Sequence, residues 1–191
     1  MRTDVGRPRN RAIDEAVLRV TVELIGESSY ADLSLDAIAV RAGTSKPAIY
    51  RRWRGKAHLV HEAVFPIDET TELPETGSLE GDVQEMIRRT LAVLSTPAAR
   101  AALPGLIGEM ASDPTLHTAL LERFGDILVR GLTDYLESAT RRGEVRRDVT
   151  ATDLAESIAG MTLLALITRG AAIDENWVGR TARLITKGIS S

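Results

Sequence analysis

Six basic side chains lie close together between Arg41 and Lys56, and this segment contains no acidic residue. Cationic side chains grouped in this way bind polyanions, above all the phosphates of nucleic acids. The alternative is an ordinary solvated face, which basic runs also form. The rest of the chain contrasts with this segment, because residues 1–64 carry a formal charge of +3 and residues 65–191 a charge of −6. The contrast favours a local site for a polyanion.

Residues 45–54 predict a helix with two different faces. Ile49 and Trp53 are spaced i, i+4, and we expect both to pack into a core. The residues of the other face follow the spacing i, i+3, i+4 and i+7, namely Pro47, Tyr50, Arg51 and Arg54. A helix in the major groove of DNA needs donors for phosphate, apolar surface for thymine methyls and an N-terminus that favours negative charge. The second face offers all three.

A shorter helix is predicted just before this one, from an apolar stripe made of Leu35, Ile38, Ala39 and Ala42. Ser34 is placed to cap its N-terminus, and Gly43 follows at the position where a positive φ angle is cheap. Ser45 is placed to cap the second helix, whose first turn tolerates Pro47. The pattern predicts a helix, a tight glycine turn and a second helix. Helix-turn-helix proteins read DNA with the second of these helices.

These residues resemble the DNA-binding domain of the TetR family of bacterial regulators over about residues 9–65. The resemblance lies in the run Leu35-x-x-Ile38-Ala39-x-x-Ala42-Gly43-Thr44-Ser45-Lys46-Pro47-Ala48-Ile49-Tyr50-Arg51-Arg52-Trp53-x-x-Lys56-x-x-Leu59. The remaining residues resemble the family only in length, helical pattern and helix order. The family implies a homodimeric repressor that binds a palindromic operator in double-stranded DNA. It also implies release by a small-molecule effector, which binds to the C-terminal domain.

The resemblance assigns roles to individual positions of the motif. Lys46, Pro47 and Ala48 form the tip that contacts bases, where Ala48 could touch only a thymine methyl. Tyr50 contacts a phosphate, and Arg51 could donate two hydrogen bonds to guanine. Arg52 and Lys56 are expected to contact the DNA backbone, and the two capping serines to contact phosphates. The expected DNA-binding residues are Ser34, Thr44, Ser45, Lys46, Pro47, Ala48, Tyr50, Arg51, Arg52 and Lys56, together with Arg7 and Arg9 of the N-terminal arm.

The N-terminal arm contains Gly6-Arg7-Pro8-Arg9, which resembles the core of a minor-groove AT-hook. Proline holds such a chain extended, and Arg7 would enter a groove where A·T tracts concentrate negative potential. The alternative is a disordered tail that only aids solubility.

The fold class predicted for all 191 residues is all-α, with a three-helix helix-turn-helix domain at residues 7–66. Residues 66–77 contain two prolines, one glycine and four acids, so we interpret them as a linker. A larger helical domain for effector binding and dimerisation is expected at residues 78–191. Its predicted helices are 83–94, a broken helix at 98–112 around Pro104, 113–143, 150–168 and 176–189.

The last two predicted helices are more apolar than a domain of this size requires. Leu154, Ile158, Met161, Leu164 and Ile167 lie on the first of them, and its small residues would allow close helix approach. The family pairs these two helices with those of a second copy, as a four-helix interface. The alternative is an ordinary pair of core helices.

A cavity between the C-terminal helices would hold the effector, but each candidate lining residue could also be plain core. Aromatic residues are only 4% of the chain, so a compact apolar effector suits it better than a flat one. The candidates are Met86, Thr90, Leu94, Leu103, Ile107, Met110, His117, Leu121, Phe124 and Met161.

Two other functions are alternatives to a ligand-controlled regulator. A metal-dependent enzyme could use His58, His61 and Glu62 with His117, but no cysteine, Ser-His-Asp signature or phosphate-binding loop accompanies them. We therefore expect no enzyme, no metal and no cofactor. The second alternative is a DNA-binding regulator whose C-terminal domain binds a protein partner or nothing. No apolar run reaches a membrane span and no secretory signal is apparent, so we expect a cytoplasmic protein with no membrane partner.

Overall fold

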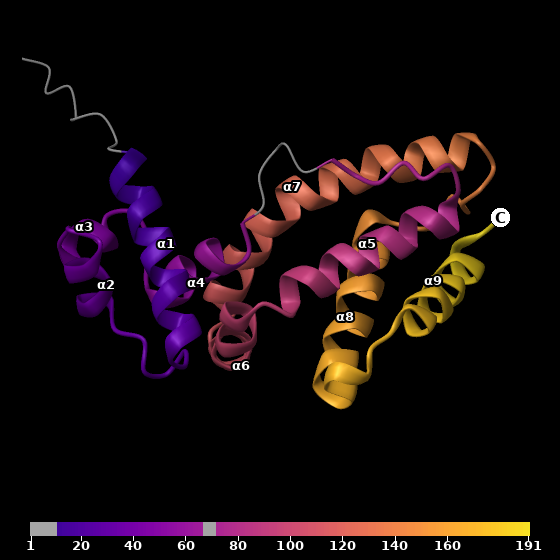
Figure 1. Ribbon diagram of the computed structural model, residues 1–191. Helices are drawn as coiled ribbons and strands as arrows, with labels where there is room; N and C mark the ends of the chain where they lie inside the picture. The colour runs from indigo at the N-terminus through magenta and orange to yellow at the C-terminus, as the bar shows by residue number, and fades with distance from the viewer. Residues whose placement is uncertain (1–10, 67–71) are drawn as a thin grey trace, which may run out of the picture. The chain divides into compact units, whose positions relative to one another are not determined.

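The computed structural model describes residues 11–66 and 72–191, without the side chains of residues 117, 120–130 and 171. The chain is all-α, as predicted, and the described residues form no strand (Figure 1). A single backbone bridge joins Val145 to Ser190. The helices are α1 (Arg11–Glu27), α2 (Leu35–Arg41), α3 (Lys46–Tyr50), α4 (Lys56–Val64), α5 (Leu79–Leu94), α6 (Pro97–Ser112), α7 (Pro114–Arg141), α8 (Ala151–Arg169) and α9 (Glu175–Ile189), with a 3-10 turn η1 (Gly170–Ala172).

The described residues divide into two compact units, of which the first combines residues 11–66 with residues 101–116. In this unit α1 packs against α4 and α2, and α2 packs against α3 (Figure 1). Branched side chains from all four helices are fully buried between them, including Val17, Ile25, Ile38, Ile49, Leu59 and Val60. Burial of each such side chain stabilises the fold by about 1.5–3 kcal/mol, and this free energy holds the short helices together.

Most of α6 belongs to the first unit because Tyr30 packs directly on its backbone. A Cβ atom placed on Gly105 would lie 2.1 Å from the Cδ1 atom of the Tyr30 ring. The Tyr30 N–H donates to the carbonyl of Ala101 at 3.3 Å. The Lys56 ammonium lies 4.4 Å from the centroid of the same ring and donates to the Tyr30 carbonyl at 2.9 Å. Burial, and then the nearby Glu109 carboxylate, raise the pKa of the Tyr30 phenol above its usual value. Residues 101–116 therefore pack with the first unit.

α6 is one continuous helix from Pro97 to Ser112, so the prediction of a broken helix was wrong. Pro104 lies inside it but on its exposed side. The opposite side is buried through Ala99, Ala102 and Leu106. Proline has no N–H and cannot make its backbone hydrogen bond in the helix. Packing of the buried side keeps the helix continuous despite this missing bond.

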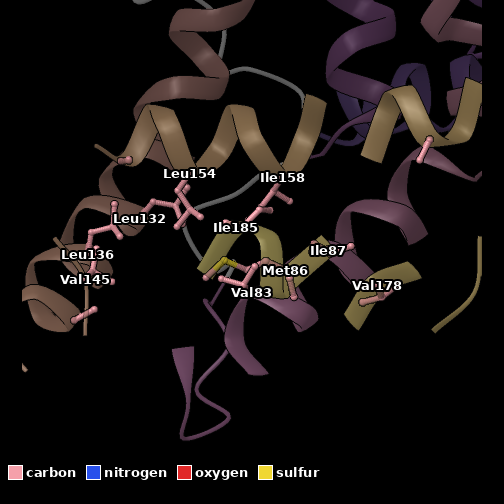
Figure 2. Packing of buried hydrophobic residues seen from close by; sticks show 14 of the residues in the cluster. Val83, Met86, Ile87, Leu132, Leu136, Val145, Leu154, Ile158, Val178 and Ile185 are labelled. Carbon is pink, nitrogen blue, oxygen red and sulfur yellow. The ribbon is translucent and has the colours of Figure 1, made fainter. Parts of the chain in front are cut away.

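The second unit contains residues 72–100 and 117–191. Here α5 packs against α8 and α9. Figure 2 shows the core between them, to which α7 contributes Leu132 and Leu136. The α7–α8 connection adds Val145, which is buried beside the C-terminal end of α9. α8 begins with a capping box, in which Thr150 and Asp153 each bond the other's backbone N–H.

α8 buries one apolar face and exposes another. Leu154, Ile158 and Ala165 are buried, whereas Leu164 and Ile167 are 61% and 70% exposed. By length and composition alone α8 could cross a membrane, as could the bent pair α5 and α6, and 28% of the apolar window of α8 is buried within the chain. An exposed apolar stripe of this kind also marks a protein interface.

Candidate nucleic-acid interface

Backbone N–H groups in the turn between α2 and α3 donate hydrogen bonds to carbonyls of α2 itself. Gly43 has a φ angle of +66°, in the left-handed region where glycine is favoured. The Thr44 N–H donates to the Ala39 carbonyl at 2.9 Å and the Gly43 N–H donates to the Val40 carbonyl at 3.2 Å. These two bonds form a Schellman motif, which ends α2 sharply. The predicted glycine turn is confirmed.

The two predicted serine caps are also confirmed. The Ser34 hydroxyl accepts from the Asp36 N–H at 3.2 Å, and the Ser45 hydroxyl accepts from the Ala48 N–H at 3.4 Å. Both serines are exposed, and each hydroxyl keeps its own proton for donation. Thr44, between the helices, is half-buried.

α3 divides into the two faces that the spacing predicted. Ile49 and Trp53 are buried, and the Trp53 indole N–H donates to the Glu62 carboxylate at 2.8 Å. Tyr50 is 51% exposed. Pro47, Arg51 and Arg54 are exposed as well. The regular helix ends at Tyr50, earlier than expected, but the Trp53 N–H still donates to the Ile49 carbonyl at 2.9 Å and keeps the helical phase.

The side chain of Ala48, which was expected to contact a base, is buried in the free protein. It is only 7% exposed, so a thymine methyl could reach very little of it. The physical reason is the shortness of α3, which packs on α2 and places two consecutive residues, Ala48 and Ile49, against the core of the first unit. Ala48 therefore supports the position of α3.

Arg52 and Lys56 are both engaged inside the first unit. Arg52 forms an ion pair with Asp14 of α1 and donates to the Ala48 carbonyl at 3.2 Å. Lys56 donates to the Tyr30 carbonyl. Contact of either side chain with a DNA backbone would compete with these bonds, whereas the Arg51 guanidinium is exposed.

Lys46, at the tip of α3, pairs with Asp36 of α2 at 2.8 Å. Both side chains are largely exposed, so the pair contributes little to stability. The hydrogen bond to Asp36, more than its charge, raises the pKa of the Lys46 ammonium. The predicted contacts of Arg7 and Arg9 lie outside the described residues.

The second unit contains a small apolar cavity between α5, α7 and α8, with a volume of about 130 Å³. Of the ten predicted ligand residues, Met86 and Thr90 line it, and Leu94, Leu103, Ile107, Met110 and Met161 do not. Ile107 and Met161 are exposed, on α6 and on the outer face of α8. The side chains of His117, Leu121 and Phe124 lie outside the described residues. The other lining residues are Glu72, Leu73, Pro74, Arg89, Leu132, Ala155 and Ile158.

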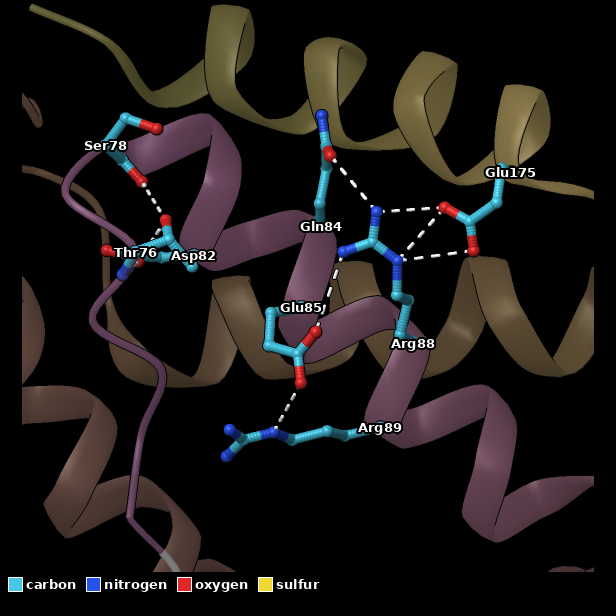
Figure 3. Close-up of polar contacts among 8 residues, drawn as sticks. All are labelled: Thr76, Ser78, Asp82, Gln84, Glu85, Arg88, Arg89 and Glu175. Carbon is cyan, nitrogen blue, oxygen red and sulfur yellow. Dashed lines mark hydrogen bonds and ion pairs between the residues drawn. The ribbon is translucent and has the colours of Figure 1, made fainter.

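Sequence reasoning missed the cavity residues Leu73 and Pro74 because they resembled a linker. In the structure Pro74 is buried, and the strap that we define as residues 72–76 is tied to α5 (Figure 3). The buried Asp82 carboxylate accepts from the Thr76 N–H at 2.6 Å and from the Tyr135 hydroxyl at 2.9 Å. Burial, and then Asp82, raise the pKa of the Tyr135 phenol.

An ion-paired group joins α5 to α9 beside this strap. The Arg88 guanidinium donates to the Glu175 carboxylate at 2.9 and 3.0 Å, as Figure 3 shows. The hydrogen bond from Arg88 lowers the pKa of Glu175. No set of three metal-ligating side chains comes together within the described part of the chain.

Two family models match the chain. The model described as "Bacterial regulatory proteins, tetR family" matches residues 17–63, and the "Tetracyclin repressor-like, C-terminal domain" matches residues 73–185. The chain is 30% identical over 177 residues to a DNA-binding transcriptional repressor, TetR, of Mycobacteroides abscessus, covering 90% of both proteins. It is 26% identical over 197 residues to the HTH-type transcriptional regulator YdeS of Bacillus subtilis, covering 100% of this chain and 96% of YdeS.

Solved structures share the fold. The TetR family transcription regulator SCO0332 superposes with a TM-score of 0.70 at 24% identity, covering 94% of this chain and 99% of that one. GusR of Salmonella enterica gives a TM-score of 0.67 at 17% identity, covering 97% and 98%. The fold and the exposed helix α3 define a helix-turn-helix DNA-binding protein. The chain belongs to the TetR family, and it is a DNA-binding transcriptional regulator rather than an enzyme.

Proposed function

We propose that the protein is a homodimeric repressor that binds a palindromic operator and leaves it when a small molecule binds to the second unit. The observation that carries this proposal is the division of α3, in which Tyr50 and Arg51 are exposed while Ile49 and Trp53 anchor the helix. The name of the Mycobacteroides abscessus relative, a transcriptional repressor, supports the direction of control. We place the protein in the cytoplasm, where it meets DNA.

The outer surface of α8 supports the dimer. Leu164, Ile167 and the α9 residue Leu184 are each more than 60% exposed, although all three are large and apolar. Gly160 on the same helix has no atom within 4 Å of an added Cβ, so a second helix could approach closely there. A two-fold dimer would present two copies of α3 to half-sites about 34–36 Å apart.

The DNA half of the proposal is tested by selecting bound duplexes from a random pool with the full chain. We expect an enriched palindrome whose half-sites are one helical turn apart, or a multiple of one turn. A single unrepeated site would contradict the dimeric mode, and a pool without enrichment would contradict sequence-specific binding. Salt dependence of the enriched site then measures how many phosphate contacts the protein makes.

Alanine substitutions of the neighbouring residues Arg51 and Arg52 should distinguish an effect on DNA binding from an effect on folding stability. We expect Arg51→Ala to weaken operator binding by about 1–3 kcal/mol, with the free energy of unfolding nearly unchanged, because the side chain is exposed. We expect Arg52→Ala to lower the free energy of unfolding by about 1–3 kcal/mol, because it leaves the half-buried Asp14 carboxylate unpaired.

Urea unfolding and operator titration on both variants measure the two effects. Equal losses of operator affinity in the two variants, with unchanged stability in both, would show that Arg52 leaves Asp14 to contact DNA. Unchanged binding in Arg51→Ala would remove Arg51 from the interface.

A further inference from the structure

We propose that the cavity between α5, α7 and α8 binds a compact, uncharged, apolar molecule about the size of one six-membered ring. This inference rests on the proposed function, since it names the chemical class of the effector. Three properties of the cavity support it: its volume, its mostly apolar wall, and the strap that forms one side of it.

The volume of the cavity limits the ligand to a small molecule. It measures about 130 Å³. An apolar cavity of about 150 Å³ in another protein holds benzene, whereas pockets for drug-sized ligands begin at roughly 300 Å³. Met86, Leu132 and Ile158 form its wall from three different helices. A single ring or a short branched chain fits this space without movement of the helices.

Two polar side chains of the wall, Thr90 and Arg89, are bonded within the chain, and the third, Glu72, is exposed. The Thr90 hydroxyl donates to the Met86 carbonyl at 2.9 Å. The Arg89 guanidinium donates to the Glu85 carboxylate at 3.0 Å and to the Glu72 carbonyl at 2.7 Å. A charged ligand would lose its hydration against a wall formed mostly by apolar side chains, which is strongly unfavourable. The wall therefore favours an uncharged ligand.

The strap separates the cavity from a wider groove, and its displacement would open a route into the cavity. Glu72, Leu73 and Pro74 line the cavity and also line a wider polar groove, so they separate the two spaces. Thr76 fixes one end of the strap to Asp82, and Arg89 holds Glu72. Displacement of the segment between these two attachments would connect the cavity to the groove.

The test follows the methyl group of Met86 by NMR in the full chain, with methionine methyls labelled by ¹³C and assigned by Met→Leu variants. Met86 lines the cavity, and Met161 on the outer face of α8 is an internal control. Toluene is the probe, and benzoate and benzylamine have a similar size but carry a charge. We expect toluene to shift the Met86 methyl and not Met161, and both charged probes to bind at least about tenfold more weakly.

A matched pair of variants tests the location. Ala155→Leu adds apolar volume inside the cavity and should abolish the toluene shift at Met86, whereas Thr152→Leu adds it on the exposed side of the same helix and should not. Ala155→Val replaces the first variant if it does not fold. A shift at Met161 alone, equal binding of the charged probes, or no shift at Met86 would overturn the inference.

Operator binding separates this inference from the proposed function. If the protein selects a palindrome but toluene does not reach Met86, the assigned ligand class is wrong and the proposed function as a DNA-binding regulator still holds. If toluene binds at Met86 but no DNA is enriched, the cavity assignment stands and the proposed function fails.

Discussion

Replacing Gly105 with alanine is expected to lower the free energy of unfolding by about 2 kcal/mol. An added Cβ would lie 2.1 Å from Cδ1 and 2.4 Å from Cγ of the Tyr30 ring. The ring has little room to retreat, because Tyr30 is buried and Lys56 lies over it. Overpacking of this kind typically costs about 1–3 kcal/mol, and the better helix propensity of alanine offsets part of it. Urea unfolding monitored by circular dichroism measures the change.

Gly108 is the matched control on the same helix, because an added Cβ there meets no atom within 4 Å. Gly108→Ala should therefore raise the free energy of unfolding by roughly 0.5–1 kcal/mol. A double-mutant cycle with Tyr30→Ala should show that the two sites are coupled. Similar stabilisation by both alanine substitutions would mean that Tyr30 does not pack on α6.

Leu164→Glu is expected to convert the proposed dimer to monomers and to weaken binding to the proposed operator at least about 100-fold. The leucine is 61% exposed on the outer face of α8, so its replacement should leave the fold of the monomer intact. Two carboxylates brought together across a two-fold apolar interface would be desolvated and would repel each other. A single DNA-binding unit also loses the second half-site. Analytical ultracentrifugation and operator titration measure the two losses.

Val93→Glu is the control for this experiment, since Val93 is an exposed apolar residue on a different helix, α5. It should leave the mass and the operator affinity unchanged. A dimer that survives Leu164→Glu with full affinity would place the interface on another surface.

The helix-turn-helix could be predicted closely because its signals are local. Ser34, Gly43 and Ser45 determine where α2 ends and α3 begins through bonds that span only two to five residues. The i, i+4 spacing of Ile49 and Trp53 likewise identifies the buried face of α3. Such features depend on helical geometry alone, so one sequence is enough to predict them.

The features that sequence reasoning missed depend on partners far apart in the chain. Arg52 is held by Asp14, which lies on α1, and Lys56 is held by Tyr30, 26 residues away. Neither pairing leaves a signal in spacing. The continuous course of α6 through Pro104 depends on the packing of its alanine face, which overrides a local helix breaker.

The cavity was missed for the same reason. The sequence pattern assigned Ile158 to a helix of the dimer interface, and it assigned Leu73 and Pro74 to a linker. Their convergence on Met86 and Leu132 arises only when three helices and the strap are assembled. A pattern along one helix identifies its apolar side but does not show whether that side meets a neighbour closely or leaves a gap.

The ion pair between Lys46 and Asp36 has a consequence for the energetics of DNA binding. Because the ammonium already has an anionic neighbour at 2.8 Å in the free protein, a phosphate that approaches it exchanges one partner for another. Fewer condensed cations leave the duplex per protein than the number of basic residues on this surface suggests. The carboxylate also repels any phosphate that does not displace it. We therefore expect non-specific binding to DNA to be penalised more than binding to the proposed operator, where contacts with base edges can compensate.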